Sequence, residues 1–117
     1  MDNEKIISAI KEKWDARNEH LTLLFRNRDK AAIVDPMEEA IDDFLTLLFL
    51  TNGKITPDKN LLQESIKGLN YKPINLEERF SFILKKPNQY HSFIQLNELY
   101  QEVLKLYAKL KILSYKK

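Results

Sequence analysis

The chain has 117 residues, of which 44% are hydrophobic and 31% are charged, and it contains no cysteine. This length fits one domain, residues 1–117, that can bury a core without a metal or a disulfide. The balance of 19 basic against 17 acidic residues does not by itself indicate nucleic-acid binding, and the lack of cysteine excludes thiol catalysis and zinc–thiolate sites.

The first predicted helix covers residues 3–29. Its apolar positions recur at a spacing of three or four residues: Ile7, Ile10, Trp14, Leu21 and Leu24. Arg17 falls on the same stripe, so we expect it to meet an acid from the second helix or to extend its charged end into water. A break at Asn18 is the alternative to one continuous helix.

The second predicted helix begins with Asp35 as its N-cap and Pro36 in its first turn. It should end at residues 51–53, because Asn52 or Gly53 can adopt the left-handed conformation there. The next segment predicts a short helix that opens at Thr56-Pro57 and ends at Gly68.

The fourth predicted helix begins after Asn75, which we expect to cap it, and ends before Pro87. Its expected core residues are Leu76, Phe80, Ile83 and Leu84. Phe82 points the other way, beside Arg79 and Lys86. We expect burial on both sides of this helix, with stacking of Arg79 on an aromatic ring and an exposed Phe82 at a partner surface as alternatives.

The last predicted helix begins within residues 88–91 and continues to about Leu113. Its leucine repeat is flanked by further apolar residues, and this wide apolar arc favours contact with several helices. Leu99, Val103 and Leu106 are the expected deepest core positions. The sequence therefore predicts an all-α, single-domain helical bundle of about four to five helices with a long C-terminal helix.

A polar strip follows this last helix: His91, Gln95, Glu98, Glu102, Lys105 and Lys109. Its simplest interpretation is a solvated face with a Glu102–Lys105 pair, and the alternative is a recognition strip beside Tyr90. At the junction before it, Tyr90 should bury its ring and His91 should hydrogen-bond across to the preceding helix. The candidate recognition or junction residues are Arg79, Tyr90, His91 and Gln95.

The sequence shows no pattern that carries catalysis or holds a cofactor. His91 and Glu98 lie about 10.5 Å apart along a helix, too far to grip one metal ion. There is no glycine-rich phosphate loop and no nucleophile elbow. We therefore predict no catalytic, cofactor-binding or metal-binding residue, and most simply no enzyme.

Two segments, "FLTLLFLTNGK" and "NLEERFSFILKKPNQYHSFIQLNELYQEVLKLYAK", resemble the YpoC-like family of low-GC Gram-positive bacteria. The resemblance covers residues 40–107 and includes an NGK helix end, an EER-x-x-FIL block and a YH-x-F-IQL block. Ile74 stands where the family pattern has valine. The resemblance implies a bacterial cytosolic protein and no established activity, cofactor or ligand.

Three functional hypotheses remain. The first is a non-enzymatic module that binds another protein. The second is a nucleic-acid-associated protein that uses the C-terminal lysines with Arg26, Arg28 and Lys30. The third is an enzyme with a site near Arg79 and His91. The longest apolar run, residues 44–50, is too short to cross a membrane, and the acidic front of the chain is unlike a signal peptide. We expect a cytoplasmic protein, as a monomer or a homodimer.

Overall fold

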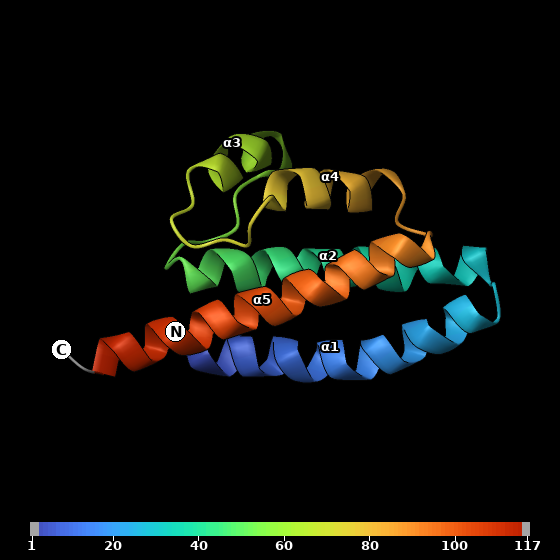
Figure 1. Ribbon diagram of the computed structural model, residues 1–117, viewed down its shortest axis with the longest axis horizontal. Coiled ribbons are helices and arrows are strands. Elements are labelled where there is room, and N and C mark those ends of the chain that lie inside the picture. The colour runs from blue at the N-terminus through green and yellow to red at the C-terminus, as the bar shows by residue number, and fades with distance from the viewer. Residues whose placement is uncertain (1–2, 116–117) are drawn as a thin grey trace.

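Five α-helices and one short 3₁₀-helix form the protein in the computed structural model, which describes residues 3–115. They are α1 (Asn3–Arg26), α2 (Lys30–Thr51), η1 (Lys59–Leu61), α3 (Leu62–Lys67), α4 (Leu76–Lys85) and α5 (Tyr90–Tyr115). Residues 3–115 contain no strand, which confirms the all-α prediction and the long C-terminal helix. The three long helices α1, α2 and α5 pack together, and α3 and α4 lie on one side of them (Figure 1).

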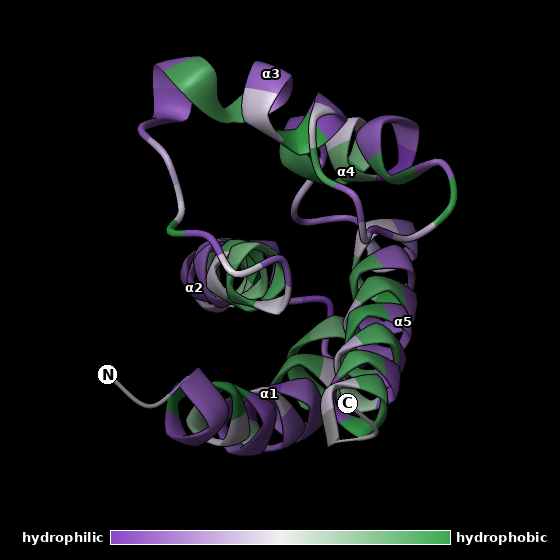
Figure 2. Cartoon of the chain, turned by 90° about the vertical axis from the view of Figure 1, so that its left-hand side faces the viewer, coloured by the Kyte–Doolittle hydropathy of each residue, from purple (hydrophilic) through white to green (hydrophobic). Residues whose placement is uncertain are grey.

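The core lies where the apolar sides of the helices face one another (Figure 2). Tyr100 on α5 is at its centre. The Tyr100 ring stacks on Trp14 of α1, with centroids 4.1 Å apart, and its hydroxyl donates a hydrogen bond of 2.5 Å to the carbonyl oxygen of Ala40 on α2. One buried side chain therefore joins all three long helices.

α1 is continuous through Asn18 and ends at Arg26, three residues before the predicted end. The Asn18 amide donates to Asn97 Oδ1 on α5 at 2.9 Å, so Asn18 bonds a neighbouring helix instead of capping a second segment. The chain leaves α1 through a tight turn in which Arg28 has a φ of 57°.

Arg17 meets two acids of α2, as predicted. Its guanidinium donates to Asp43 Oδ2 at 3.1 Å and to Glu39 Oε2 at 3.0 Å, and Lys13 Nζ lies 3.1 Å from the same Asp43 oxygen. The apolar stripe of α1 therefore tolerates a cation because the acidic run of α2, residues 35–43, supplies its partners.

The predicted start of α2 at Asp35 is wrong. The helix begins at Lys30, and Asp29 is the N-cap, whose carboxylate accepts a hydrogen bond of 3.2 Å from the Ala32 N–H. Pro36 lies inside the helix instead of in its first turn. The earlier cap and the helix-forming pair Ala31–Ala32 extend α2 by about one and a half turns ahead of the proline.

Residues 53–70 form a small lobe that contains η1 and α3 (Figure 1). Its two ends are joined by Asn52, which ends α2. The Asn52 amide donates to the Tyr71 carbonyl at 2.8 Å, and its Oδ1 accepts from the Tyr71 N–H at 2.9 Å. Gly53 takes the left-handed conformation with a φ of 69°, as predicted for this helix end. α3 ends at Lys67 with Gly68 as its C-cap, as predicted, but the predicted start at Thr56-Pro57 is wrong, because residues 54–58 are not helical, Asp58 is extended and η1 begins at Lys59.

α4 begins at Leu76, but the predicted side-chain cap is wrong. Asn75 has a φ of 58°, and its side chain forms no capping hydrogen bond. Pro87 separates α4 from α5 as expected, with Lys86 as the last residue of the α4 turn. At the junction, the Ser92 hydroxyl donates to the Lys86 carbonyl at 2.5 Å.

Two of the predicted core positions are wrong. Leu84 is 50% exposed, whereas Leu76, Phe80 and Ile83 of the same helix are buried. On α5, Leu99 and Val103 are fully buried, but Leu106 is only partly buried. The core on α5 is centred about one turn earlier than the leucine repeat indicates, because α4 and the middle of α2 cover that part of the helix.

Candidate functional site

Arg79 on α4 binds the polar strip of α5. Its Nε donates to Gln95 Oε1 at 3.1 Å, and its two terminal nitrogens donate to both carboxylate oxygens of Glu102, at 3.1 and 2.5 Å. It also donates to the Ile74 carbonyl at 3.0 Å and lies 3.7 Å from Glu98 Oε2. Because the planar guanidinium donates several hydrogen bonds at once, these contacts fix its orientation between α4 and α5.

The environment of Arg79 stabilises its charged form. Its side chain is 18% exposed. The hydrogen bond to Glu102 raises the pKa of Arg79 against the opposing effect of desolvation, and the charges of Glu102 and Glu98 add to the increase. The cluster therefore fastens α4 to α5. The expected Glu102–Lys105 pair is replaced by the Arg79–Glu102 pair, and Arg79 stacks on no ring among the described aromatic contacts.

His91 and Phe82 meet edge to face at the α4–α5 junction, with ring centroids 5.2 Å apart and planes 85° apart. Phe82 is partly buried, which is less than the two-sided burial that we expected. His91 is exposed, and its imidazole forms no hydrogen bond with residues 3–115, so the expected bond across the junction is wrong. The two helices are joined there by a ring contact and by the Ser92–Lys86 bond.

Tyr90 is 59% exposed, which corrects the expected burial of its ring. It lies edge-on to Phe25 of α1 at a centroid distance of 5.7 Å and tilted against Phe93 at 6.1 Å. The four candidate residues therefore do not lie in one cluster. Arg79 and Gln95 bond to each other, His91 packs on Phe82, and Tyr90 faces a different pair of rings.

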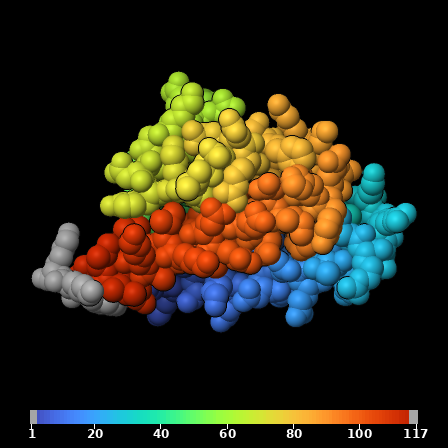
Figure 3. Space-filling view, in the orientation of Figure 1, coloured from blue at the N-terminus to red at the C-terminus, as the bar shows by residue number. Residues whose placement is uncertain are grey.

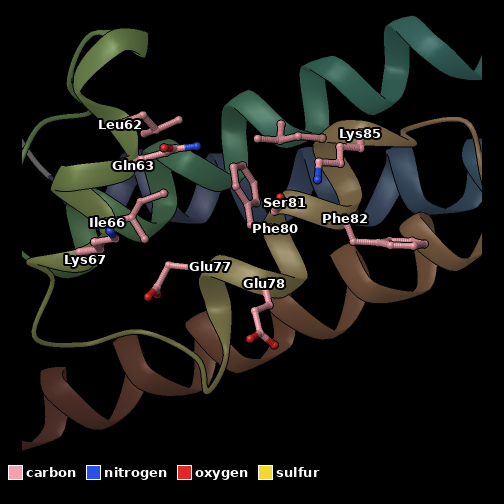
Figure 4. Close-up of a pocket in the computed structure, with 11 residues that line it drawn as sticks. Leu62, Gln63, Ile66, Lys67, Glu77, Glu78, Phe80, Ser81, Phe82 and Lys85 are labelled. Carbon is pink, nitrogen blue, oxygen red and sulfur yellow. The ribbon is translucent and has the colours of Figure 1, made fainter.

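A groove lies between α3 and α4, at residues that the sequence did not single out as a site. It has a volume of about 540 Å³. Leu62 and Ile66 of α3 and Phe80 of α4 point into the space between the two helices (Figure 4). A second hollow of about 490 Å³ continues from it toward α2 and shares Leu62, Gln63 and Leu84 with it. We call the two together the α3–α4 groove.

The α3–α4 groove has an apolar floor and charged rims. Glu77 and Glu78 lie at the start of α4, and Glu38 and Asp42 of α2 border the second hollow. Lysines on its sides are Lys59, Lys67 and Lys85. Leu84, half-exposed, lies in the shared part. No signal in the sequence indicated this groove, because the position of Leu84 on the apolar stripe of α4 predicts burial, whereas the side chain is half-exposed.

The basic residues of the second hypothesis lie at opposite ends of the molecule, which is 49 Å long. The α1–α2 turn with Arg26, Arg28 and Lys30 is at one end, and the C-terminal part of α5 with Lys105, Lys109 and Lys111 is at the other (Figure 3). Lys116 and Lys117 lie outside the described residues. Lys111 also forms an ion pair with Glu4 of α1. The two groups therefore do not form one surface.

Arg79, Tyr90, His91 and Gln95, near which the enzyme hypothesis places its site, line neither part of the α3–α4 groove. Residues 3–115 contain no cluster of three or more His, Asp or Glu side chains that could hold a metal ion. In the same range, every helix is too short or too polar to cross a membrane.

Comparison with known proteins agrees with the resemblance seen in the sequence. The chain matches the family described as YpoC-like protein over residues 4–115. It is 37% identical over 110 residues to the uncharacterized protein YpoC of Bacillus subtilis (strain 168), in an alignment that covers 92% of this chain and 66% of the relative. The chain thus spans slightly less than two thirds of that protein's length. No solved structure matches it. The match over nearly the whole described chain shows that the protein belongs to the YpoC-like family.

Proposed function

We propose that the protein is a non-enzymatic interaction module that binds an amphipathic helix of another protein in the α3–α4 groove. The observation that carries this proposal is the open apolar floor of the groove. The buried Ile66 and Phe80 form its base, the partly buried Leu62 lines its side, and Leu84 leaves half of its surface exposed. A groove of this kind between helices is where an amphipathic helix lays its apolar side.

The charges at the rim specify the partner further. Glu38 and Asp42 are one helical turn apart on α2, both are exposed, and neither forms an ion pair within residues 3–115. Glu39 and Asp43 of the same acidic run are instead bound to Arg17. A partner helix with apolar anchors in the groove and basic residues at one end complements this rim, and such charges increase the rate of association.

The lobe that forms one wall of the groove can adjust to a partner at low cost. α3 has six residues and only one buried side chain, Ile66. Lys72 holds its C-terminal end by donating to the carbonyls of Ile66 and Lys67 at 3.1 and 3.2 Å. A wall with so little buried surface belongs to the part of a protein that opens most easily.

The test is a photo-crosslinking experiment in living cells followed by reconstitution. A photoreactive amino acid replaces Ser81, which lines the groove, and as a control it replaces Ser8, which is exposed on α1. The proposal expects a crosslink to one protein from position 81 and none to it from position 8. The crosslinked protein is then purified and its affinity for the wild-type chain is measured.

Leu84→Lys is the decisive variant, and Leu23→Lys is its matched control because Leu23 is 53% exposed and lies outside the groove. Loss of an anchor residue should weaken binding by about 30-fold or more, whereas Leu23→Lys should leave it unchanged. Equal losses in both variants would contradict the proposal. A crosslink from position 81 only to another copy of the chain would replace it with self-association.

A further inference from the structure

A second surface lies at the end of the molecule where the α1–α2 turn meets the α4–α5 junction. The contact between Phe25 and Tyr90, at 5.7 Å, joins the two segments, and Phe25 also stacks on Phe93 at 5.3 Å. Both segments lie at the same end of the molecule (Figure 1). We call this surface the basic end and define it as Arg26, Arg28, Lys30, Lys86 and Tyr90.

The basic end carries four cations that the protein itself does not neutralise. All four side chains are exposed, and none forms an ion pair within residues 3–115. The acid closest in sequence, Asp29, already accepts the capping hydrogen bond from Ala32. Helices α2 and α5 begin at this end while α1 and α4 finish there, so their dipoles oppose one another. The positive charge at this end is therefore carried by the four basic side chains.

Tyr90 gives this surface an aromatic ring in a fixed orientation. Phe25 contacts it with the ring planes 67° apart and Phe93 supports it at 50°, yet 59% of Tyr90 remains exposed. A ring that is held from one side and open to solvent on the other can stack on a planar group without losing much conformational freedom. The backbone of Lys86 is fixed at the junction, where its carbonyl oxygen accepts the hydrogen bond of the Ser92 hydroxyl.

We propose that the basic end binds single-stranded nucleic acid, with a base stacked on Tyr90 and the adjacent phosphates bound by Arg26, Arg28, Lys30 and Lys86. Single-strand binding uses this combination of cations and exposed aromatic rings. A duplex keeps its base faces inside the stack, so it can use the cations but not the ring. The surface is separate from the α3–α4 groove and from the C-terminal lysines.

The experiment measures fluorescence anisotropy of a labelled oligothymidylate of about 12 nucleotides, within the range of single-strand site sizes. The proposal expects saturable binding that weakens as salt rises from about 50 to 200 mM, with a logarithmic slope no steeper than about −3 for four phosphate contacts. An unlabelled hairpin duplex should compete less well than an unlabelled single strand. No saturable binding at the lowest salt would overturn the proposal.

Two pairs of variants locate the site. Arg26→Glu with Arg28→Glu should abolish binding, and the control Lys105→Glu with Lys109→Glu, which makes the same charge change at the other end, should leave it intact. Tyr90→Ala should weaken binding by about 5- to 150-fold, the range for loss of one stacked base, while Tyr90→Phe should retain it. Tyr71→Ala removes another exposed tyrosine, in the lobe, and should have no effect.

Three results would contradict the proposal. Equal losses in the two charge-reversed proteins would mean that the attraction depends on overall charge alone. Binding that is unchanged in Tyr90→Ala, together with equal binding of anionic lipid vesicles, would indicate a general polyanion or membrane surface. A loss of oligonucleotide binding in Leu84→Lys would place the nucleic acid in the α3–α4 groove. If Leu84→Lys still binds the oligonucleotide, the two proposed binding surfaces are separate.

Discussion

The hydroxyl of Tyr100 provides a sharp test of how the three long helices are held together. Replacing Tyr100 with Phe removes one buried hydrogen bond of 2.5 Å to the Ala40 carbonyl and leaves the ring stacked on Trp14. Loss of one such bond should lower the free energy of unfolding by about 1 kcal/mol at pH 7. Guanidinium denaturation, followed by Trp14 fluorescence and circular dichroism, measures this difference.

The pH dependence of this difference is the more specific part of the prediction. Burial raises the pKa of Tyr100 well above its ordinary value, and the charge of Asp43 adds to the increase, with Arg17 opposing it. The folded protein then keeps the phenol neutral while the unfolded chain ionises above about pH 10. The contribution of Tyr100 to the free energy of unfolding is fully present below about pH 10. Above that pH it falls by about 1.4 kcal/mol per pH unit.

Phenylalanine does not ionise, so the Tyr100→Phe variant does not lose stability in this way. Its free energy of unfolding should equal that of the wild type at about pH 11. All other residues are the same in both proteins, so their contributions cancel in the difference. Tyr71→Phe, at an exposed position, serves as the control and should track the wild type at every pH. A constant gap between wild type and Tyr100→Phe from pH 8 to beyond about pH 11 would refute the argument that the phenol is buried.

Three further predictions concern the core and the ion pairs. Leu99→Ala should lower the unfolding free energy by about 2–5 kcal/mol, and Leu106→Ala, at a partly buried position, should cost distinctly less; equal costs in denaturation would contradict the placement of the core. Arg17→Met should be neutral or stabilising because Asp43 keeps Lys13 and Glu39 is exposed to water, while Asp43→Ala, which leaves Arg17 with only the exposed Glu39, should be destabilising; indifference to both would mean that the pair contributes nothing. Arg79→Met should lower stability by about 1–3 kcal/mol because it leaves Glu102 and Gln95 without their partner, and an effect below about 0.5 kcal/mol would show that the α4–α5 contact does not depend on this cluster.

The sequence was sufficient for features that depend on neighbours along the chain. The spacing of apolar residues predicted the helices and the all-α class, and Gly53, Gly68 and Pro87 marked helix ends that the structure confirms. The ion pair of Arg17 was also predictable, because a cation on an apolar stripe needs an acid and the next helix carries an acidic run, residues 35–43. The YpoC-like family was recognisable from two short segments.

Prediction from local sequence patterns was wrong at the starts of α2 and α4. Asp35 before Pro36 is a good helix start, but Asp29 is also a good cap, and only the packed structure shows that the earlier one is used. Asn75 has the right spacing for a cap, yet the chain enters α4 through the left-handed conformation, which turns its side chain away from that role. A sequence gives each signal separately and does not rank them.

Sequence patterns were enough to predict the helices, their apolar sides and the family. The contacts of the exposed and polar side chains depend on how the helices pack. The sequence of the polar strip of α5 does not show whether the strip faces water or Arg79. Gln95 and Glu102 accept hydrogen bonds from Arg79 because α4 packs against this part of α5. Leu84 and Tyr90 are apolar enough for the core, and they remain exposed because no helix covers them. Helix formation depends on residues three or four apart, but burial depends on residues that the fold brings together from distant parts of the chain.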